Sequence, residues 1–196
     1  MHSLREPRGP VTYGHGDVNG DGSPDLVAVN TDGRIWARLG GGRQLRAGVP
    51  ASASLRLQAL ADLFGGGRAG IVVASSTAGC CRSYQLLGAS SVVLIYRHQR
   101  LKLLHYPSGR LFVLLFNTGR GDAYAGIRCS GHRLTQTTVF LAASSRLSVT
   151  ASTYRLTRNT VTRREPSTRT VSGSERQALA LTTTKCPGMN RYGWAG

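Results

Sequence analysis

Four aspartates lie close together near the start of a chain that is otherwise strongly basic. The 196 residues include only nine Asp and Glu against 25 Lys and Arg, a formal net charge of +16. Asp17, Asp21, Asp25 and Asp32 are four of those nine acids. Neighbouring carboxylates repel one another, so such a cluster is costly unless a positive partner offsets its charge. The cluster therefore predicts a bound cation.

The spacing of the oxygen-bearing residues indicates which cation is expected. The predicted ligands are Asp17, Asn19, Asp21, Ser23 and Asp25. Ser23 would contribute its backbone carbonyl oxygen, and the other four residues would contribute side-chain oxygens. Gly20 and Gly22 permit the tight turn that would wrap these groups round one ion. Hard oxygen donors suit Ca²⁺ and its 6 to 8 ligands better than zinc. We expect calcium here, and the alternative is an acidic turn without metal.

The loop resembles the FG-GAP/VCBS repeat, in which a D-x-[DN]-x-D-G-x-x-D-hydrophobic segment precedes a strand of a propeller blade. The match is close over 16–29 and looser over 62–73. The resemblance implies a propeller-like fold, calcium in the loop, and an exported or surface protein that serves adhesion or recognition. An EF-hand loop opens similarly but needs an acid where this chain has Ala28, in a Leu-Val-Ala-Val strand.

A second copy of the loop becomes visible when Asp17 is aligned with Asp62. Its glycines coincide with those of the first loop, as Gly65 and Gly67. The other acids are missing, because the second segment reads Asp-Leu-Phe-Gly-Gly-Gly. We therefore expect the turn to be kept there and the calcium to be lost.

The rest of the chain predicts an all-β fold. Val, Thr, Ser, Tyr and Gly are abundant, and apolar residues nowhere persist at helical spacing. Repeats of about 45 to 60 residues predict β-propeller-like blades in an incomplete or atypical arrangement. We expect an N-terminal tail over 1–10 and a single repeat domain over 11–190. Its expected units are 11–56, 57–108 and 109–170, followed by a Ser/Arg/Thr-rich stretch and a last strand at 178–183.

Shorter elements can also be placed. Asp32 and Gly33 form an Asp-Gly turn between the apolar segment 26–29 and the alternating segment 34–39, which predicts a β-hairpin directly after the acidic loop. Further strands are expected at 92–97, 100–103, 151–155 and 160–163.

The positive charge is carried almost entirely by arginine, since the only lysines are Lys102 and Lys185. A basic balance of this size is typical of proteins that bind nucleic acid, an anionic membrane or an acidic polymer. The arginines are scattered through the expected strands and turns, which favours a solvated basic face. The densest group is Arg155, Arg158, Arg163, Arg164 and Arg169. Binding to nucleic acid or an acidic glycan is the alternative function, although aromatic residues are sparse near these arginines, which disfavours nucleic acid.

The cysteines and apolar segments bear on the compartment. Cys129 and Cys186 are expected to pair, which implies an oxidising environment. For the adjacent Cys80 and Cys81, three states are open: a strained bond between them, two free thiols, or bonds to other partners. No zinc-like spacing is present. No apolar run approaches the ~18 residues of a membrane helix, and no signal peptide is visible at the N-terminus. An extracytoplasmic location is nonetheless expected, whereas the oligomeric state is open.

No catalytic constellation emerges from the sequence. There is no Gly-x-Ser-x-Gly elbow, and few carboxylates lie outside the acidic loop. The histidines lie on separate segments, and each is expected to be a surface or packing residue. We therefore expect a non-enzymatic recognition or scaffold module whose partner is an unknown protein or glycan.

Overall fold

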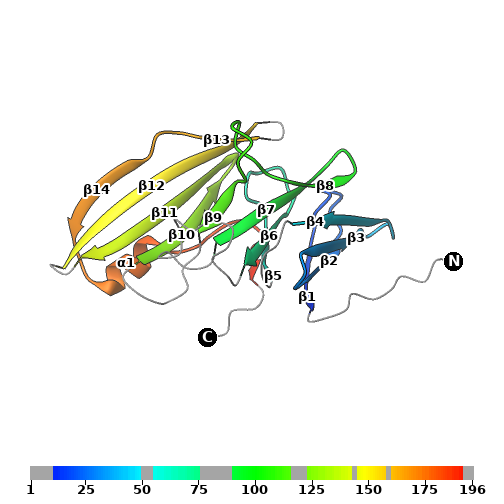
Figure 1. Ribbon diagram of the computed structural model, residues 1–196, viewed down its shortest axis with the longest axis horizontal. Helices are drawn as coiled ribbons and strands as arrows, with labels where there is room; N and C mark the ends of the chain where they lie inside the picture. The colour runs from blue at the N-terminus through cyan, green and yellow to red at the C-terminus, as the bar shows by residue number, and fades with distance from the viewer. Residues whose placement is uncertain are drawn as a thin grey trace.

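The computed structural model describes residues 11–49, 55–75, 90–115, 123–142, 145–157 and 160–191. The predicted tail over 1–10, the Cys80–Cys81 pair and Arg158 lie outside these residues. The described part contains three antiparallel sheets and one short helix, which confirms the all-β prediction. The sheets follow one another along the longest axis of the molecule, and the described residues do not close into a propeller ring (Figure 1).

The first sheet is a four-stranded meander in the order β1-β2-β3-β4. Its strands are β1 (Val11–Gly16), β2 (Asp25–Asn30), β3 (Arg34–Arg38) and β4 (Gln44–Gly48). The expected hairpin is β2 and β3, which turn at Asp32 and Gly33, and Gly33 takes a φ of 90°. The acidic loop connects β1 to β2, so it lies at one end of this sheet.

The second sheet contains another four-stranded meander, with two short strands at its margins. Its strands are β5 (Leu55–Ala61), β6 (Gly70–Ser75), β7 (Ser90–Arg97), β8 (Arg100–Leu103), β9 (Val113–Leu115) and β15 (Asn190–Arg191). The second, acid-poor loop connects β5 to β6, the same place in its meander that the acidic loop has in the first.

The third sheet is built from longer strands and differs from the other two. It comprises β10 (Ala123–Ser130), β11 (Arg133–Ala142), β12 (Arg146–Thr157), β13 (Thr160–Arg163) and β14 (Ser167–Ser172). Both β13 and β14 pair with β12, at its two ends. The long strand β12 therefore organises this sheet.

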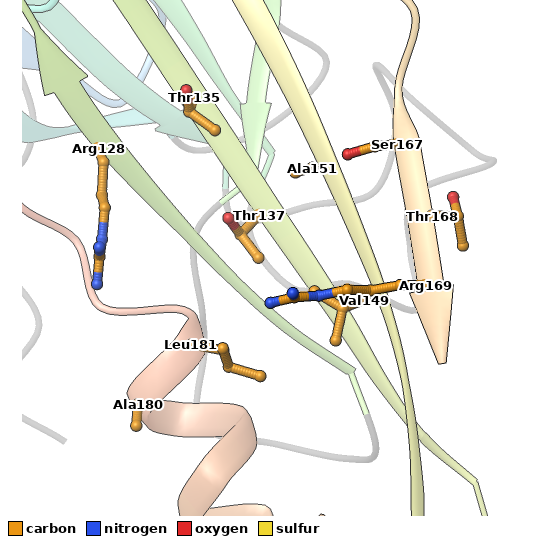
Figure 2. A pocket seen from close by; sticks show the side chains of 10 residues that line it. All are labelled: Arg128, Thr135, Thr137, Val149, Ala151, Ser167, Thr168, Arg169, Ala180 and Leu181. Carbon is orange, nitrogen blue, oxygen red and sulfur yellow. The ribbon is translucent and has the colours of Figure 1, made fainter. Parts of the chain in front are cut away.

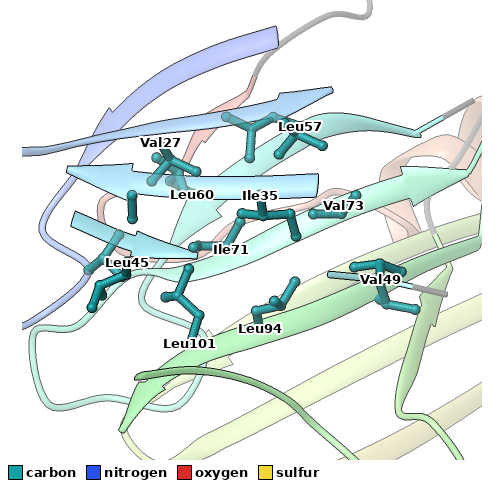
Figure 3. Close-up of a cluster of buried hydrophobic side chains, with 14 of the residues drawn as sticks. Val27, Ile35, Leu45, Val49, Leu57, Leu60, Ile71, Val73, Leu94 and Leu101 are labelled. Atoms are coloured by element: carbon teal, nitrogen blue, oxygen red, sulfur yellow. The ribbon is translucent and has the colours of Figure 1, made fainter. Parts of the chain in front are cut away.

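Two apolar cores join the three sheets. Aliphatic side chains of the first sheet, such as Val27 and Ile35, pack against Leu60, Ile71 and Leu94 of the second sheet (Figure 3). Alternation along the strands places these residues on one face of each sheet. Burial of apolar surface, worth about 25 cal/mol per Å², holds the two meanders face to face.

The second core lies between the second and third sheets and is aromatic at its centre. Phe112 lies 5.1 Å from Tyr154 and 5.6 Å from Tyr106, both in edge-on geometry, and Phe64 lies 6.3 Å away. Cys129 and Cys186 form a disulfide beside this core, with their Cα atoms 4.7 Å apart, so the expected pairing is confirmed.

The strand predicted at 178–183 is wrong, because this segment lies in and just after helix α1 (Glu175–Leu181). The physical reason is local: Ser174 and Gln177 form a capping box, and the sequence that follows is rich in Ala and Leu, which favour helix. Ala178 is buried against Tyr124 and Val139, so α1 covers one face of the third sheet.

Candidate functional site

The acidic loop begins where the β1–β2 ladder ends, at the pair Gly16 and Asp25. Gly20 and Gly22 have φ angles of 81° and 84°, a region that only glycine enters without strain. The sequence therefore fixes a tight, specific turn, as predicted.

Asp17 holds this turn closed through its side chain. Its Oδ1 accepts hydrogen bonds from the backbone N–H groups of Gly20 at 2.6 Å and Asp21 at 3.1 Å, and its Oδ2 accepts one from Gly22 at 2.8 Å. Its backbone carbonyl accepts a hydrogen bond from the N–H of Ala69 in the second loop, at 2.6 Å. Asp17 therefore orders its own loop and joins it to the next.

Asp25 anchors the loop from inside the protein. It is fully buried, with 0% exposure. Its Oδ2 accepts from the N–H groups of Val18 at 2.8 Å and Asn19 at 3.2 Å, and its Oδ1 accepts from Gly40 at 2.9 Å. Three backbone donors thus compensate a buried carboxylate that would otherwise be costly.

The remaining predicted ligands lie, with Asp17, on the rim of the loop, where Asp21 and Ser23 are exposed and Asp17 and Asn19 are half-buried. Asn19 donates from Nδ2 to Oδ2 of Asp21 at 2.7 Å, and Asp21 accepts the N–H of Ser23 at 2.8 Å. The hydrogen bond from Asn19 is the main cause that lowers the pKa of Asp21 from its ordinary value of 3.8. Asp21 is therefore ionised at neutral pH and accessible to a cation.

The acidic loop offers donors of the kind that calcium prefers, but in this conformation they do not converge on one point. Among the described residues, no three Asp, Glu, His or Cys side chains are close enough to hold a metal ion. The loop carboxylates point at separate sets of backbone amides. Repulsion between the acids is thus already offset by N–H groups, and a calcium ion would have to rearrange the rim of the loop.

The second loop shows why its acids are missing. Phe64, which stands where the first loop has Asn19, is only 6% exposed and packs against Phe112. The turn itself is retained: Oδ2 of Asp62 accepts the N–H of Gly67 at 2.9 Å, at the same separation along the chain as Asp17 and Gly22. This loop has become part of a core instead of a polar rim.

An arginine side chain from the second loop lies over the acidic loop. The side chain of Arg68 passes so close to Gly20 that a Cβ atom there would meet its Nε at 2.7 Å. Arg68 therefore brings positive charge to the acidic loop, which the sequence alone did not indicate.

A second candidate site lies on the third sheet, next to the end of α1. It is a cavity of ≈ 390 Å³ between this sheet and the helix (Figure 2). Arg128 and Arg169 stand at its sides, and Thr137 and Ala151 form part of its floor. This site was missed by sequence reasoning, although Arg169 belongs to the arginine group that was singled out.

Two histidines near the second and third sheets lie against the backbone of neighbouring segments. His105 and His132 each place Nδ1 near a backbone carbonyl, that of Leu103 at 3.1 Å and that of Phe64 at 2.9 Å. In both cases the ring contributes to local packing.

Comparison with known protein families, characterised proteins and solved structures finds no match for this chain. The resemblance to the FG-GAP/VCBS repeat therefore stays a prediction. Over the described residues, no helix is long and apolar enough to cross a membrane.

Proposed function

We propose that this chain is a non-enzymatic, propeller-type recognition or scaffold module of an exported protein, and that its acidic loop binds Ca²⁺. The observation that supports this most is the rim of the loop. There Asp17, Asn19 and Asp21 present hard oxygen donors on a turn that Gly20 and Gly22 shape.

The residues on the rim would share the ion, together with the carbonyl oxygen of Ser23 and water. Oδ2 of Asp17, Oδ1 of Asn19 and both carboxylate oxygens of Asp21 each accept one hydrogen bond from the loop. Carboxylate and amide oxygens accept about two, so these atoms have room for an ion. Asp25 acts as the anchor of the loop, because it is fully buried and its oxygens accept three backbone N–H groups inside the protein. Calcium would replace the contact between Asn19 and Asp21, so binding is expected to be modest and to need a calcium-rich compartment.

The two meanders support the propeller-type interpretation. Each has four strands in chain order and a loop between its first and second strands. In both loops an aspartate accepts the N–H of a glycine at the same sequence separation. The disulfide between Cys129 and Cys186 fits an oxidising compartment and therefore export.

Thermal unfolding with calcium and with a chelator tests the proposal. At ten times Kd, calcium that binds only the folded state adds about 1.4 kcal/mol, which raises the Tm of a chain of this size by about 3 to 6 °C. The Asp21→Ala variant should lose this shift. Asp32→Ala, which removes an equal charge from the neighbouring hairpin turn, should keep it. Identical melting of the wild-type protein in both conditions would contradict calcium binding.

A second candidate function, binding of an acidic polymer, is favoured by a separate observation. Arg128 and Arg169 flank the cavity on the third sheet, and neither has a carboxylate partner among the described residues. This function does not exclude the first, because the two sites lie on different sheets.

A further inference from the structure

The strand register of the third sheet gathers arginines and hydroxyl groups on one face. Residues that pair across antiparallel strands share a face, and so do residues two apart along a strand. The register aligns Arg128 with Thr135 and Thr153, and Val149 with Arg169. All of these lie on the face that carries α1, as the burial of Val149 under the helix shows.

The same face continues past the cavity to a further cationic row. Arg133 of β11 stands directly opposite Arg155 of β12. Both are exposed, and like charges in opposed positions destabilise a sheet unless an anion lies between them. Neither has a carboxylate partner in the part of the chain that the structure describes. This row therefore has unused capacity for an anion.

The rows form a track whose length follows from strand geometry. Arg169 lies in the row of Val149, and Arg128 lies in the row of Thr153. The two rows are four residues apart along β12, which is about 13 Å. The pair of Arg133 and Arg155 lies two residues further, at about 20 Å in all. Charges at such intervals match a linear polymer with an anionic group on successive units better than a single small anion.

The cavity lies within this track because the floor is made of small side chains. The row that contains Gly126, Thr137, Ala151 and Ser167 lies between the levels of Arg128 and Arg169. Gly126 is covered by the end of α1, since a Cβ there would meet the carbonyl oxygen of Thr182 at 1.7 Å. The rest of the row is open, and Thr137 presents a hydroxyl to it (Figure 2).

We propose that this face binds a linear acidic polysaccharide, with Arg128, Arg133, Arg155 and Arg169 contacting its sulfate or carboxylate groups and the cavity receiving one sugar unit. Hydroxyl side chains on the floor suit the hydroxyl groups of a sugar. Among the described residues of β10 to β14, the aromatic ring on this face is that of Tyr124, which is buried under α1 and gives bases no platform for stacking. This favours a polysaccharide over single-stranded nucleic acid. The proposal gives the recognition module its ligand class, but its site is independent of the acidic loop.

The test is binding of heparin, measured by calorimetry at several salt concentrations in the presence of a calcium chelator. The Arg128→Ser/Arg169→Ser variant should bind at least tenfold more weakly, and its slope of log K against log salt should fall by about two, one for each lost contact. The matched control is Arg38→Ser/Arg46→Ser, which removes the same charge from exposed positions of the first sheet. It should bind within about threefold of the wild-type protein.

A variant without charge change tests the cavity. Ala151→Phe fills the floor and should weaken heparin binding at least tenfold, while urea unfolding verifies that the variant folds. Equal losses in the two double-arginine variants would overturn the proposal, as would undiminished binding by Ala151→Phe or no binding by the wild-type protein. If oligo-dT bound more tightly than heparin at equal salt, the ligand of this face would be a nucleic acid and not a polysaccharide. Because a chelator is present, failure here is distinguishable from failure of calcium binding.

Discussion

At the scale of single residues, the aspartates of the acidic loop have different tasks although the sequence presents them as equals. Asp25 is buried and bound to three backbone N–H groups, whereas Asp21 lies on the exposed rim. The spacing of these residues predicted a shared ligand set. It could not predict that backbone amides already satisfy the carboxylates, because this depends on how the loop meets Gly40 of a later turn.

Asp25→Ala is expected to lower the free energy of unfolding by about 3 kcal/mol, because the backbone N–H groups of Val18, Asn19 and Gly40 lose their acceptor. The loss should be the same with calcium and with chelator, since Asp25 acts as an anchor. Urea unfolding measures it. Asp32→Ala serves as the control and should cost less than about 1 kcal/mol. A loss that appears only in calcium would make Asp25 a metal ligand instead.

At the scale of elements, several strands could be predicted, but α1 could not. Apolar segments and turn residues indicate β2, β3, β7 and β8. Strand β3 alternates between buried and more exposed residues, whereas β7 buries both faces, with Val92 in one core and Val93 in the other. The helix is short, and its sequence carries two opposing signals: a capping box that favours a helix, and a run of Ala, Leu and Thr that resembles a strand. The basic track was also missed: its alternation is visible as Arg133, Thr135 and Thr137, but only the register brings the strands together.

Gly126→Ala tests how α1 is positioned. The added methyl group would collide with the backbone of Thr182, so either the helix end or the sheet must move, at a cost of about 2 to 3 kcal/mol. Gly48→Ala in β4 is a matched control, because nothing lies within 4 Å of a Cβ there. Urea unfolding of both variants gives the comparison. Equal stability of the two would contradict the close docking of α1 on β10.

At the scale of the whole molecule, the three sheets are held together by two apolar cores and one covalent link. The sequence predicted the all-β class, but it could not predict how the sheets stack, because the cores combine residues far apart along the chain. The disulfide ties β10 to the segment after α1, across a sequence separation of 57.

Removal of this disulfide in a Cys129→Ala/Cys186→Ala variant is expected to cost about 4 kcal/mol, because the unfolded chain regains the freedom of a long loop. A reducing agent should lower the unfolding midpoint of the wild-type protein and leave that of the variant unchanged. If reduction does not alter the wild-type midpoint, the bond does not contribute to the stability of the fold.

The most direct test of calcium binding is a titration of ¹⁵N-labelled protein with Ca²⁺, followed through the backbone amide resonances. We expect saturable shifts centred on Gly20, Asp21 and Gly22, because their N–H groups bond to Asp17, whose oxygens the ion would share. The same titration of Asp21→Ala should give much weaker shifts. Resonances of the loop that stay unchanged up to millimolar calcium would contradict the assignment of a calcium site to this loop.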